Sequence, residues 1–349
     1  MTKYNLPELG WRAHFLSDMS VDEVEAFVPV RVTDIHKSEV GVIGESGAER
    51  LNMTLDLVDH GVTVGDWLLK DPETGQPVRV LERQSLLKRR NARTNVDDQL
   101  IAANVDTLFV VSSCNKDFNV ARLERYFALA HQGGAEPVLI LTKADLSDDP
   151  GKYVSEAMRS LPGVMVEALD ANAEDTPAKL APYCGAGQTV ALLGTSGVGK
   201  TTLTNALTGL NQLTQDIRDS DARGRHTTTA RSMHRMTAGG WLIDTPGMRA
   251  LRLSDAREGL EAVFSDIEEL AENCRFNDCA HGSEPGCAVQ AAIAEGNLDA
   301  GRLARWQKLL AEEAHNIQTP AEARAKSKKL QKTYNAGKAR ADAKRGGRK

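Results

Sequence analysis

The sequence predicts a multidomain chain in which a small β-barrel, a central α/β domain and a C-terminal helical domain follow one another. Residues 27–95 hold short alternating apolar segments separated by Gly, Asp and Pro, a pattern typical of an antiparallel barrel. Apolar strands alternate with helical segments over residues 96–253, which predicts a parallel sheet covered on both faces. Residues 254–319 have helical spacing interrupted by a cluster of Cys and His. We expect residues 1–26 to form a poorly packed leader and residues 320–349 a basic tail.

Five segments predict the strands of the barrel: "VPVRVTDIH", "EVGVIGES", "ERLNMTLDL", "DWLLKD" and "PVRVLER". Five short strands fit the oligonucleotide-binding fold (OB-fold), whose face and loops often contact RNA or DNA. A generic small barrel without a nucleic-acid role fits the same count, and strand number does not separate the two. The basic stretch "SLLKRRNARTN" at 85–95 follows, either as a flexible linker or as part of an RNA-facing surface.

Five apolar runs predict the strands of the central sheet: "VDTLFVVSS", "EPVLILTKADL", "VMVEAL", "QTVALLG" and "GGWLIDTPGM". The segment "NVARLERYFALAHQGG" has helical spacing and ends in a Gly pair, which is a stop signal for a helix. Ligands of open α/β sheets bind outside the carboxyl ends of the strands. We therefore expect a site where these runs end.

A phosphate-binding loop follows the fourth run. "GTSGVGKT", from Gly194 to Thr201, matches G-x-x-x-x-G-K-[ST] between an apolar strand and a helix. Its glycines let backbone N–H groups surround phosphates, and the N-terminus of the helix adds the positive end of its dipole. Lys200 is predicted to reach the β- and γ-phosphates, and Thr201 to bind Mg²⁺. The predicted phosphate-binding residues are Gly194, Thr195, Ser196, Gly197, Val198, Gly199, Lys200, Thr201 and Thr202.

The stretch "WLIDTPG" supplies the carboxylate of this site, from Asp244. Asp244 ends a strand and is predicted to hold Mg²⁺, directly or through water. The backbone N–H of Gly247 is predicted to meet the γ-phosphate. The polar stretch "RGRHTTTAR" lies between the two motifs and suits a loop that orders around the γ-phosphate. Thr228 is the predicted Mg²⁺ ligand of this loop, with Thr227 as the alternative.

Hydrolysis also requires a group that positions the attacking water. Met248, which follows the Asp-Thr-Pro-Gly motif, is unsuited to orienting water by hydrogen bonds. His226 is the candidate catalytic residue because an imidazole both donates and accepts. A surface histidine without a catalytic role is the alternative. Arg225 and Arg249 are weaker candidates for stabilising charge in the transition state.

"TKADL" at 142–146 resembles the Asn-Lys-x-Asp guanine motif of GTPases. In that role the carboxylate of Asp145 accepts the two donors on the guanine edge, and the stem of Lys143 packs on the base. Thr142 replaces the usual Asn, which keeps a hydroxyl and loses an amide.

The order of the motifs differs from that of most GTPases. Here the guanine motif precedes the phosphate loop, which precedes the Asp-Thr-Pro-Gly loop. A domain whose ends lie close together can be re-cut without losing its site, so we predict a circularly permuted domain. "ALDAN" at 168–172 is then the segment that contacts the base through its backbone, with Asp170 in place of a Ser. The chain after Asp244 leads directly into the C-terminal domain. We therefore expect that a change of bound nucleotide can be transmitted to that domain.

Four potential metal ligands lie within fourteen residues: Cys274, Cys279, His281 and Cys287. Three thiolates and one imidazole suit a closed tetrahedral Zn²⁺ site, and we interpret the predicted zinc as structural. The remaining cysteines, Cys114 and Cys184, stand alone and are expected to be buried as small apolar side chains.

Composition restricts the class of protein. The chain has 349 residues, is 41% hydrophobic, and has no apolar run of membrane-spanning length. Its N-terminus lacks the pattern of a signal peptide, so a cytoplasmic monomer is the expectation. Residues 320–349 carry eleven Lys and Arg against two Asp and Glu, although the whole chain has a net charge of −5. Such a tail indicates either a polyanionic partner or a solvated end that keeps the chain soluble.

Taken together, the motifs make the chain similar to circularly permuted GTPases. It resembles, over almost its whole length, the ribosome small-subunit-dependent GTPase A family. The resemblance rests on the barrel segment, Thr142–Asp145, Gly194–Thr201, "GRHTTT", Asp244–Gly247 and the Cys/His cluster. It implies an OB-fold barrel, a permuted GTPase core and a zinc-bearing helical domain. It also implies a factor that acts late in maturation of the small ribosomal subunit, binds rRNA, hydrolyses GTP under stimulation by the subunit, and then leaves.

Two other functions fit parts of the sequence. One is a P-loop ATPase or kinase with an RNA-binding barrel, and the role of Asp145 separates it from a guanine reader. The other is an RNA-binding assembly factor whose nucleotide site is only structural. Turnover that rises with ribosomal subunits would exclude this second function.

Overall fold

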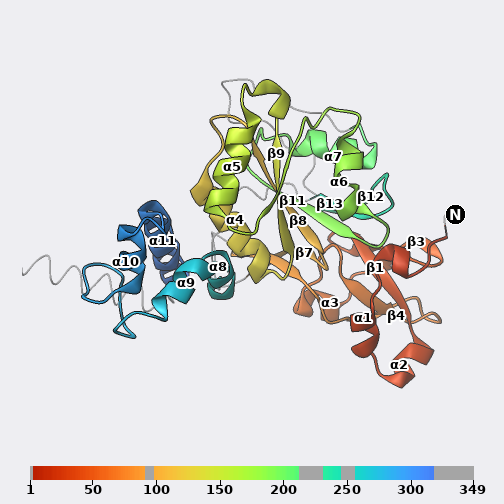
Figure 1. The fold of residues 1–349 in the computed structure, drawn as a ribbon. Coiled ribbons are helices and arrows are strands. Elements are labelled where there is room, and N and C mark those ends of the chain that lie inside the picture. The colour runs from red at the N-terminus through yellow and green to blue at the C-terminus, as the bar shows by residue number, and fades with distance from the viewer. Residues whose placement is uncertain (1–2, 91–97, 212–230, 245–255, 318–349) are drawn as a thin grey trace, which may run out of the picture.

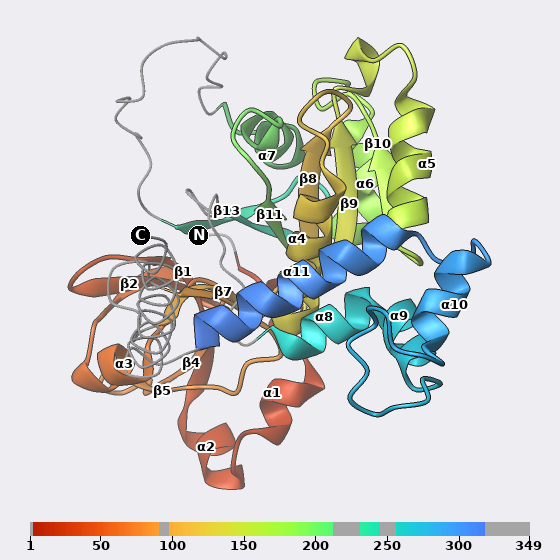
Figure 2. The same cartoon turned by 90° about the vertical axis from the view of Figure 1, so that its left-hand side faces the viewer.

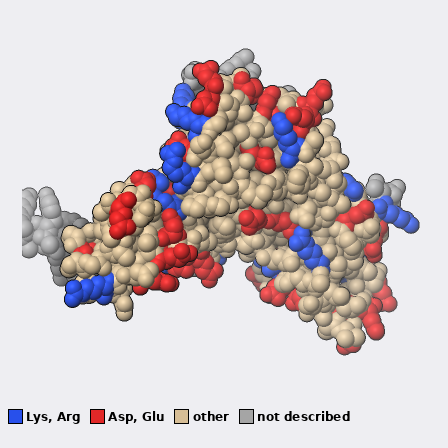
Figure 3. Space-filling model, in the orientation of Figure 1, with Lys and Arg blue, Asp and Glu red and all other residues tan. Residues whose placement is uncertain are grey.

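The computed structural model describes residues 3–90, 98–211, 231–244 and 256–317. Three parts follow one another in space as they do in the chain, with the barrel and the helical domain attached to opposite sides of the α/β domain (Figure 1). On the face drawn in Figure 3, Asp and Glu side chains gather over the barrel and over the lower side of the helical domain. This distribution agrees with the net negative charge of the residues that precede the basic tail. None of the described helices is long and apolar enough to cross a membrane.

The region predicted to be a barrel, which keeps that name below, consists of five antiparallel strands in the order β3-β2-β1-β4-β5, and β3 and β5 are not paired with each other among the described residues. They are β1 (Val28–Ile35), β2 (Glu39–Gly44), β3 (Gly47–Asn52), β4 (Trp67–Lys70) and β5 (Pro77–Val80). The predicted third strand is shorter than expected, because "LDLVDH" forms helix α3 (Leu55–His60) instead. Thr54 caps this helix, since its hydroxyl accepts a hydrogen bond from the N–H of Leu57.

The N-terminal residues are well packed, so the prediction of a poorly packed leader was wrong. They form η1 (Pro7–Leu9), α1 (Ala13–Ser17) and α2 (Val21–Ala26). Leu9 and Phe15 are fully buried, and the rings of Trp11 and Trp67 lie 4.9 Å apart. The indole N–H of Trp241 donates to the carbonyl of Glu8 at 2.8 Å. The N-terminal segment therefore contacts both the barrel and the central sheet.

Part of the basic stretch at 85–95, expected to be either a flexible linker or part of an RNA-facing surface, has regular structure. Its first part is β6 (Leu86–Arg90), which pairs antiparallel with β7 (Asp98–Ala103) in a separate two-stranded sheet. Residues 91–97 lie outside the described residues.

The central sheet has the predicted parallel strands in the order β10-β9-β8-β11-β13, followed by the antiparallel β12. The strands are β8 (Thr107–Ser113), β9 (Glu136–Thr142), β10 (Met165–Ala168), β11 (Thr189–Leu193), β12 (Ser232–Arg235) and β13 (Trp241–Asp244). Successive side chains of a strand enter opposite cores. Val110 packs with residues of α4 (Val120–Gln132) and α5 (Pro150–Ser160), whereas Val111 packs with residues of α6 (Thr176–Cys184) and α7 (Lys200–Thr208).

One buried arginine lies where the barrel meets this sheet. Arg31 on β1 is 1% exposed, and its guanidinium donates to the carbonyls of Leu9 at 2.6 Å and Asn104 at 3.1 Å. It also donates to the hydroxyl of Thr189, the first residue of β11, at 2.8 Å. Burial lowers the pKa of Arg31 to about 10. No ion pair involves Arg31 within the part of the chain that the structure describes.

The helical domain packs against α4 on the other side of the α/β domain (Figure 2). Its helices are α8 (Arg257–Val263), α9 (Ser265–Ala271), α10 (Ala288–Ala294) and α11 (Ala300–Ile317). Gly259 of α8 lies so close to α4 that an added Cβ would be 2.0 Å from the carbonyl oxygen of Ala128. A side chain larger than hydrogen at this position would push the two helices apart.

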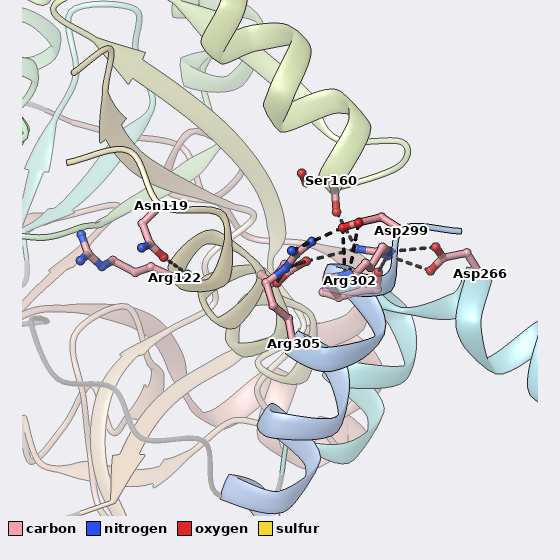
Figure 4. A network of polar contacts seen from close by, with 10 residues as sticks. Asn119, Arg122, Ser160, Asp266, Asp299, Arg302 and Arg305 are labelled. Atoms are coloured by element: carbon pink, nitrogen blue, oxygen red, sulfur yellow. Dashed lines mark hydrogen bonds and ion pairs between the residues drawn. The ribbon is translucent and has the colours of Figure 1, made fainter. Parts of the chain in front are cut away.

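An ion-pair network surrounds a second buried arginine at this junction (Figure 4). Arg302 on α11 is 4% exposed and donates to both carboxylate oxygens of Asp266 at 2.8 Å. Glu124 on α4 is fully buried and accepts from Arg302 at 3.3 Å and from Arg305 at 2.8 and 3.0 Å. Burial raises the pKa of Glu124, and the hydrogen bond from Arg305 offsets only part of that rise.

Candidate nucleotide site and metal centre

The loops predicted to bind nucleotide meet at the carboxyl edge of the central sheet. The phosphate loop follows β11, the 142–146 loop follows β9, and Asp244 ends β13. In the order β9-β8-β11-β13, β11 and β13 are neighbours, and only β8 separates β9 from β11. The permuted chain order therefore leaves the loops in one place, as the sequence predicts.

Glycines allow the phosphate loop to adopt its path. Gly197 and Gly199 have φ of 81° and 92°, a conformation that residues with a Cβ rarely adopt. A Cβ on Gly194 would lie 2.3 Å from the carbonyl oxygen of Val111 on β8. The ammonium of Lys200 donates to the carbonyls of Gly194 at 2.8 Å and Thr195 at 2.6 Å, so it lies within the loop.

The 142–146 loop is attached directly to the phosphate loop. The fully buried hydroxyl of Thr142 lies 2.6 Å from the carbonyl oxygen of Val198 and 3.1 Å from that of Ser112. The ammonium of Lys143 donates to the carbonyl of Gly197 at 2.7 Å. We call these contacts the Thr142–Lys143 clasp. The hydroxyl that Thr142 keeps in place of the asparagine amide thus links the two loops.

The clasp leaves Asp145 exposed beside it. Lys143 adopts a left-handed conformation with φ of 58°, which turns the chain into the short helix η2 (Ala144–Leu146). Burial raises the pKa of the Cys114 thiol, and the charge of Asp145 raises it further, so the carboxylate lies close to the end of β8. The loop that begins at Asp170 lies next to it, since the N–H of Ala144 donates to the carbonyl of Leu169.

Asp170 has a structural role that the sequence did not indicate. Its carboxylate accepts from the backbone N–H of Asn172 at 2.8 Å, and its carbonyl accepts from the hydroxyl of Thr176 at 2.6 Å. These bonds shape the turn that leads into α6. Asp170 thus replaces the expected Ser with another residue that forms side-chain-to-backbone turns.

Part of the predicted site lies outside the described residues. Asp244 is half-buried and pairs across the sheet with Ser232. The candidate catalytic His226, the Mg²⁺ candidates Thr227 and Thr228, and Gly247 are not among the described residues, and neither are Arg225, Met248 and Arg249.

The four predicted zinc ligands converge. The ligand atoms of Cys274, Cys279, His281 and Cys287 all lie within 4.8 Å of one another. In a tetrahedral zinc site with usual bond lengths, sulfur atoms are about 3.8 Å apart and sulfur lies about 3.6 Å from nitrogen. The two sulfurs of Cys274 and Cys287 are 3.8 Å apart, and each lies 3.6 Å from Nδ1 of His281. The donor set and its spacing therefore fit a tetrahedral metal ion.

The backbone around this cluster holds the ligands in place. His281 has φ of 56°, and its carbonyl accepts from the side chain of Gln290 at 2.6 Å. The carboxylate of Glu284 accepts from the N–H groups of Ala280 and Gly282 at 3.2 and 2.7 Å. Burial alone would raise the pKa of the Cys274 thiol, but hydrogen bonds from the backbone at the start of α10 outweigh it and lower that pKa. A backbone hydrogen bond at His281 lowers the pKa of the neighbouring Cys279 thiol, but burial and the thiols of Cys287 and Cys274 outweigh it and raise that pKa to about 11. Without a metal ion the cluster therefore forms its thiolate, the form that binds metal, at Cys274 rather than at Cys279.

The parallel sheet, the phosphate loop and the guanine-type loop placed ahead of it define a circularly permuted GTPase. A sequence profile of the RsgA GTPase family matches residues 80–254 of the chain. The chain is 46% identical to "Small ribosomal subunit biogenesis GTPase RsgA 2" of Vibrio parahaemolyticus, over 95% of its own length and 92% of that protein. It is also 46% identical to "Small ribosomal subunit biogenesis GTPase RsgA" of Mesorhizobium japonicum, over 89% and 91% of the two chains. The chain therefore belongs to the RsgA GTPase family of GTP-hydrolysing enzymes.

Solved structures show the same fold. The crystal structure of YjeQ from Thermotoga maritima matches with a TM-score of 0.60 and 24% identity, over 82% of this chain and 98% of that one. YloQ, described as a circularly permuted GTPase, matches with a TM-score of 0.61 and 24% identity, over 84% and 97%. These likenesses confirm the permuted arrangement of the central domain.

Proposed function

We propose that this protein binds the small ribosomal subunit, assists its late maturation, hydrolyses GTP to GDP and phosphate under stimulation by the subunit, and then dissociates. The names of the relatives at 46% identity support the partner. The Thr142–Lys143 clasp is the single observation that best supports the nucleotide. It joins a guanine-type loop to a phosphate loop through two short hydrogen bonds, from Thr142 to Val198 and from Lys143 to Gly197, as simultaneous contact with base and phosphates requires.

In this proposal the described loops bind GTP through distinct groups. Asp145 accepts from the guanine edge, and Lys143 covers the base while its ammonium stays on the phosphate loop. The backbone of Gly194–Thr202 surrounds the phosphates. Lys200 leaves its carbonyl partners to meet the β- and γ-phosphates. Mg²⁺ would be held by Thr201, Thr228 and Asp244 and would neutralise charge that develops on the phosphate oxygens.

The proposed catalytic step depends on His226, which orients the attacking water, while the N–H of Gly247 meets the γ-phosphate. Docking on the subunit brings the 223–231 loop and its histidine into position. Loss of the γ-phosphate releases this loop and weakens binding.

The other parts of the chain supply the contacts to the partner. The domains of the proposal are the OB-fold barrel at 27–95, the permuted GTPase domain at 96–253, and the helical domain at 254–319 with structural Zn²⁺. The leader at 1–26 and the tail at 320–349 flank them. The barrel contacts rRNA, and the basic tail adds salt-sensitive affinity that does not depend on sequence. The protein acts as a cytoplasmic monomer.

Hydrolysis of GTP and ATP by the purified protein, alone and with purified small or large ribosomal subunits, tests this function. We expect slow GTP turnover that rises sharply with the small subunit alone. His226→Ala should bind GTP normally and lose most of the stimulation. Preference for ATP, or no response to either subunit, would contradict the proposal.

The role of Asp145 has its own test. Asp145→Asn should shift the preference from guanine towards xanthine nucleotides, because the amide presents a donor where the carboxylate accepts. Unchanged GTP affinity in this variant would favour an ATPase or kinase over a guanine reader.

A further inference from the structure

Gln290 contacts two of the four predicted metal ligands, one through its backbone and one through its side chain. Its N–H donates to the sulfur of Cys287 at 3.4 Å. Its side-chain amide donates to the backbone carbonyl of His281 at 2.6 Å. The side chain is half-buried and acts on the backbone of a ligand, which leaves the ligand atoms themselves to the metal.

Helix α10 gives this side chain a fixed support. Val289 and Ala292, which flank Gln290 in the helix, are buried in the hydrophobic core. The backbone N–H of Val289 also donates to the sulfur of Cys274. Because the helix is held by its own packing, the amide of Gln290 holds the carbonyl of His281 from a fixed position.

The backbone of His281 adopts a conformation that needs such support. Its φ is 56°, in the left-handed region that few residues other than glycine adopt. The peptide group after this histidine is bonded at both ends. Its carbonyl accepts from Gln290, and its N–H, which belongs to Gly282, donates to the carboxylate of Glu284 at 2.7 Å. Two side chains therefore stabilise a backbone conformation that histidine itself does not favour.

The conformation of His281 determines the place of two ligands. Its Nδ1 lies 3.6 Å from the sulfurs of Cys274 and Cys287, so this nitrogen is the ligand atom. Its backbone N–H donates to the sulfur of Cys279. If φ returned to negative values, the ring would move relative to this N–H, and the two contacts would no longer form together.

A second glutamine contacts the same loop at a residue that is not a ligand. The amide of Gln307 on α11 donates to the carbonyl of Ala280 at 3.1 Å. The neighbouring Trp306 packs its ring 5.6 Å from that of His281. Gln307 and Gln290 thus make the same kind of bond to adjacent peptide groups, and only the bond from Gln290 reaches a carbonyl that belongs to a ligand.

We propose that Gln290 is a positioning residue for the metal centre: its side-chain amide fixes the carbonyl of His281 and thereby keeps Nδ1 of that histidine directed at the metal. Residues around a metal site commonly orient its histidine ligands. Here the contact is to the backbone of the ligand and not to its second ring nitrogen. The inference rests on the part of the proposed function that assigns Zn²⁺ to the cluster, and not on GTP binding or hydrolysis.

The test is the Zn²⁺ affinity of the full chain, measured by competition with a chelator of known affinity. Gln290→Met keeps the length of the side chain and removes the donor. We expect the Kd for Zn²⁺ to rise about tenfold, the lower end of the effect of residues that orient metal ligands. Gln307→Met is the matched control, because it removes the same kind of bond from Ala280 and should leave the Kd close to that of the wild type.

A second variant separates the lost hydrogen bond from a general loss of folding. Gln290→Lys restores a donor at this position and should recover most of the affinity. A wild-type Kd for Gln290→Met, an equal rise for Gln307→Met, or an equal rise for Gln290→Lys would each overturn the inference and leave the metal site intact. A wild-type chain that binds no Zn²⁺ would overturn the metal assignment together with the inference, and the proposed GTP hydrolysis would stand.

Discussion

The two junctions of this chain each bury an arginine, but the partners of the two arginines differ in charge. Arg31, between barrel and central sheet, donates to carbonyls and a hydroxyl. Arg302, between central sheet and helical domain, is paired with the carboxylates of Asp266 and Glu124. Removing Arg31 would leave only neutral acceptors without a donor at the first junction. Removing Arg302 would leave the carboxylates of Asp266 and Glu124 with fewer cations at the second. The same residue type therefore contributes to stability in two physically different ways.

The largest effect is expected at the charged junction. Arg302→Met removes the bidentate bond to Asp266 and one of the two cations on the fully buried Glu124. Because a buried carboxylate with fewer cations is costly, we expect a loss of about 3 kcal/mol in the free energy of unfolding, measured by urea denaturation. Adding Glu124→Gln should recover part of this loss, since the amide carries no charge. Strict additivity of the two changes would contradict the role assigned to charge.

A smaller effect is expected at the neutral junction. Arg31→Met leaves the carbonyls of Leu9 and Asn104 without this donor but leaves no paired carboxylate behind. We expect a loss of about 2 kcal/mol in the same urea experiment. Asp106→Asn is the matching second change, because Asp106 forms no ion pair with Arg31 among the described residues, although both contact Thr189. The coupling between these two losses should be smaller than that between Arg302→Met and Glu124→Gln, and a larger loss for Arg31→Met than for Arg302→Met would reverse the comparison.

Local sequence patterns predicted the helices and strands. The packing between the domains depends on contacts between residues far apart in the sequence, which such patterns do not contain. The apolar runs of the central sheet and the spacing of the phosphate loop are periodic or contiguous in sequence, and the structure confirms those elements. The four clustered metal ligands also converge. Arg31 could not be recognised, because it lies between Val30 and Val32 and all three are buried. The side chains of a strand alternate between buried and exposed only when one of its faces is exposed to solvent. One face of β1 packs inside the barrel and the other packs on the central sheet, so both sets of side chains are buried.

The same reason explains the other errors. The N-terminal residues have no long apolar period, yet Leu9 and Phe15 fill a space created by the barrel and the central sheet. Strand β12 is short and polar, so its sequence carries no strand pattern. It is extended because it pairs with β13 and β1. The clasp between Thr142 and Val198 joins residues 56 positions apart, so no local pattern records it.

The smallest expected effect concerns the ion pairs that hold the N-terminal segment, whose response to acid differs from that of the charged junction. Arg79 on β5 ties the N-terminal segment to the barrel by pairing with Asp18 and Glu23. The hydrogen bond from Arg79 is the main reason why the pKa of Glu23 is lowered to about 2. A lowered carboxyl pKa stabilises the fold above the unfolded pKa, and this contribution disappears as pH falls through the folded value. Glu124 has a raised pKa, so its contribution is present at low pH and is lost as pH rises.

Arg79→Ala tests this difference. We expect the variant to unfold about 1 kcal/mol more easily than the wild type at pH 7, because the pairs are partly exposed. The gap should shrink as pH falls from about 5 towards 2, since the carboxyl groups become neutral in both proteins. Arg257→Ala is the control, because its i,i+4 pair with Glu261 is solvent-exposed and lies in the helical domain. Urea denaturation across this pH range measures the gap. A gap that stays constant down to pH 2 would show that packing of the arginine stem, and not its charge, holds the N-terminal segment on the barrel.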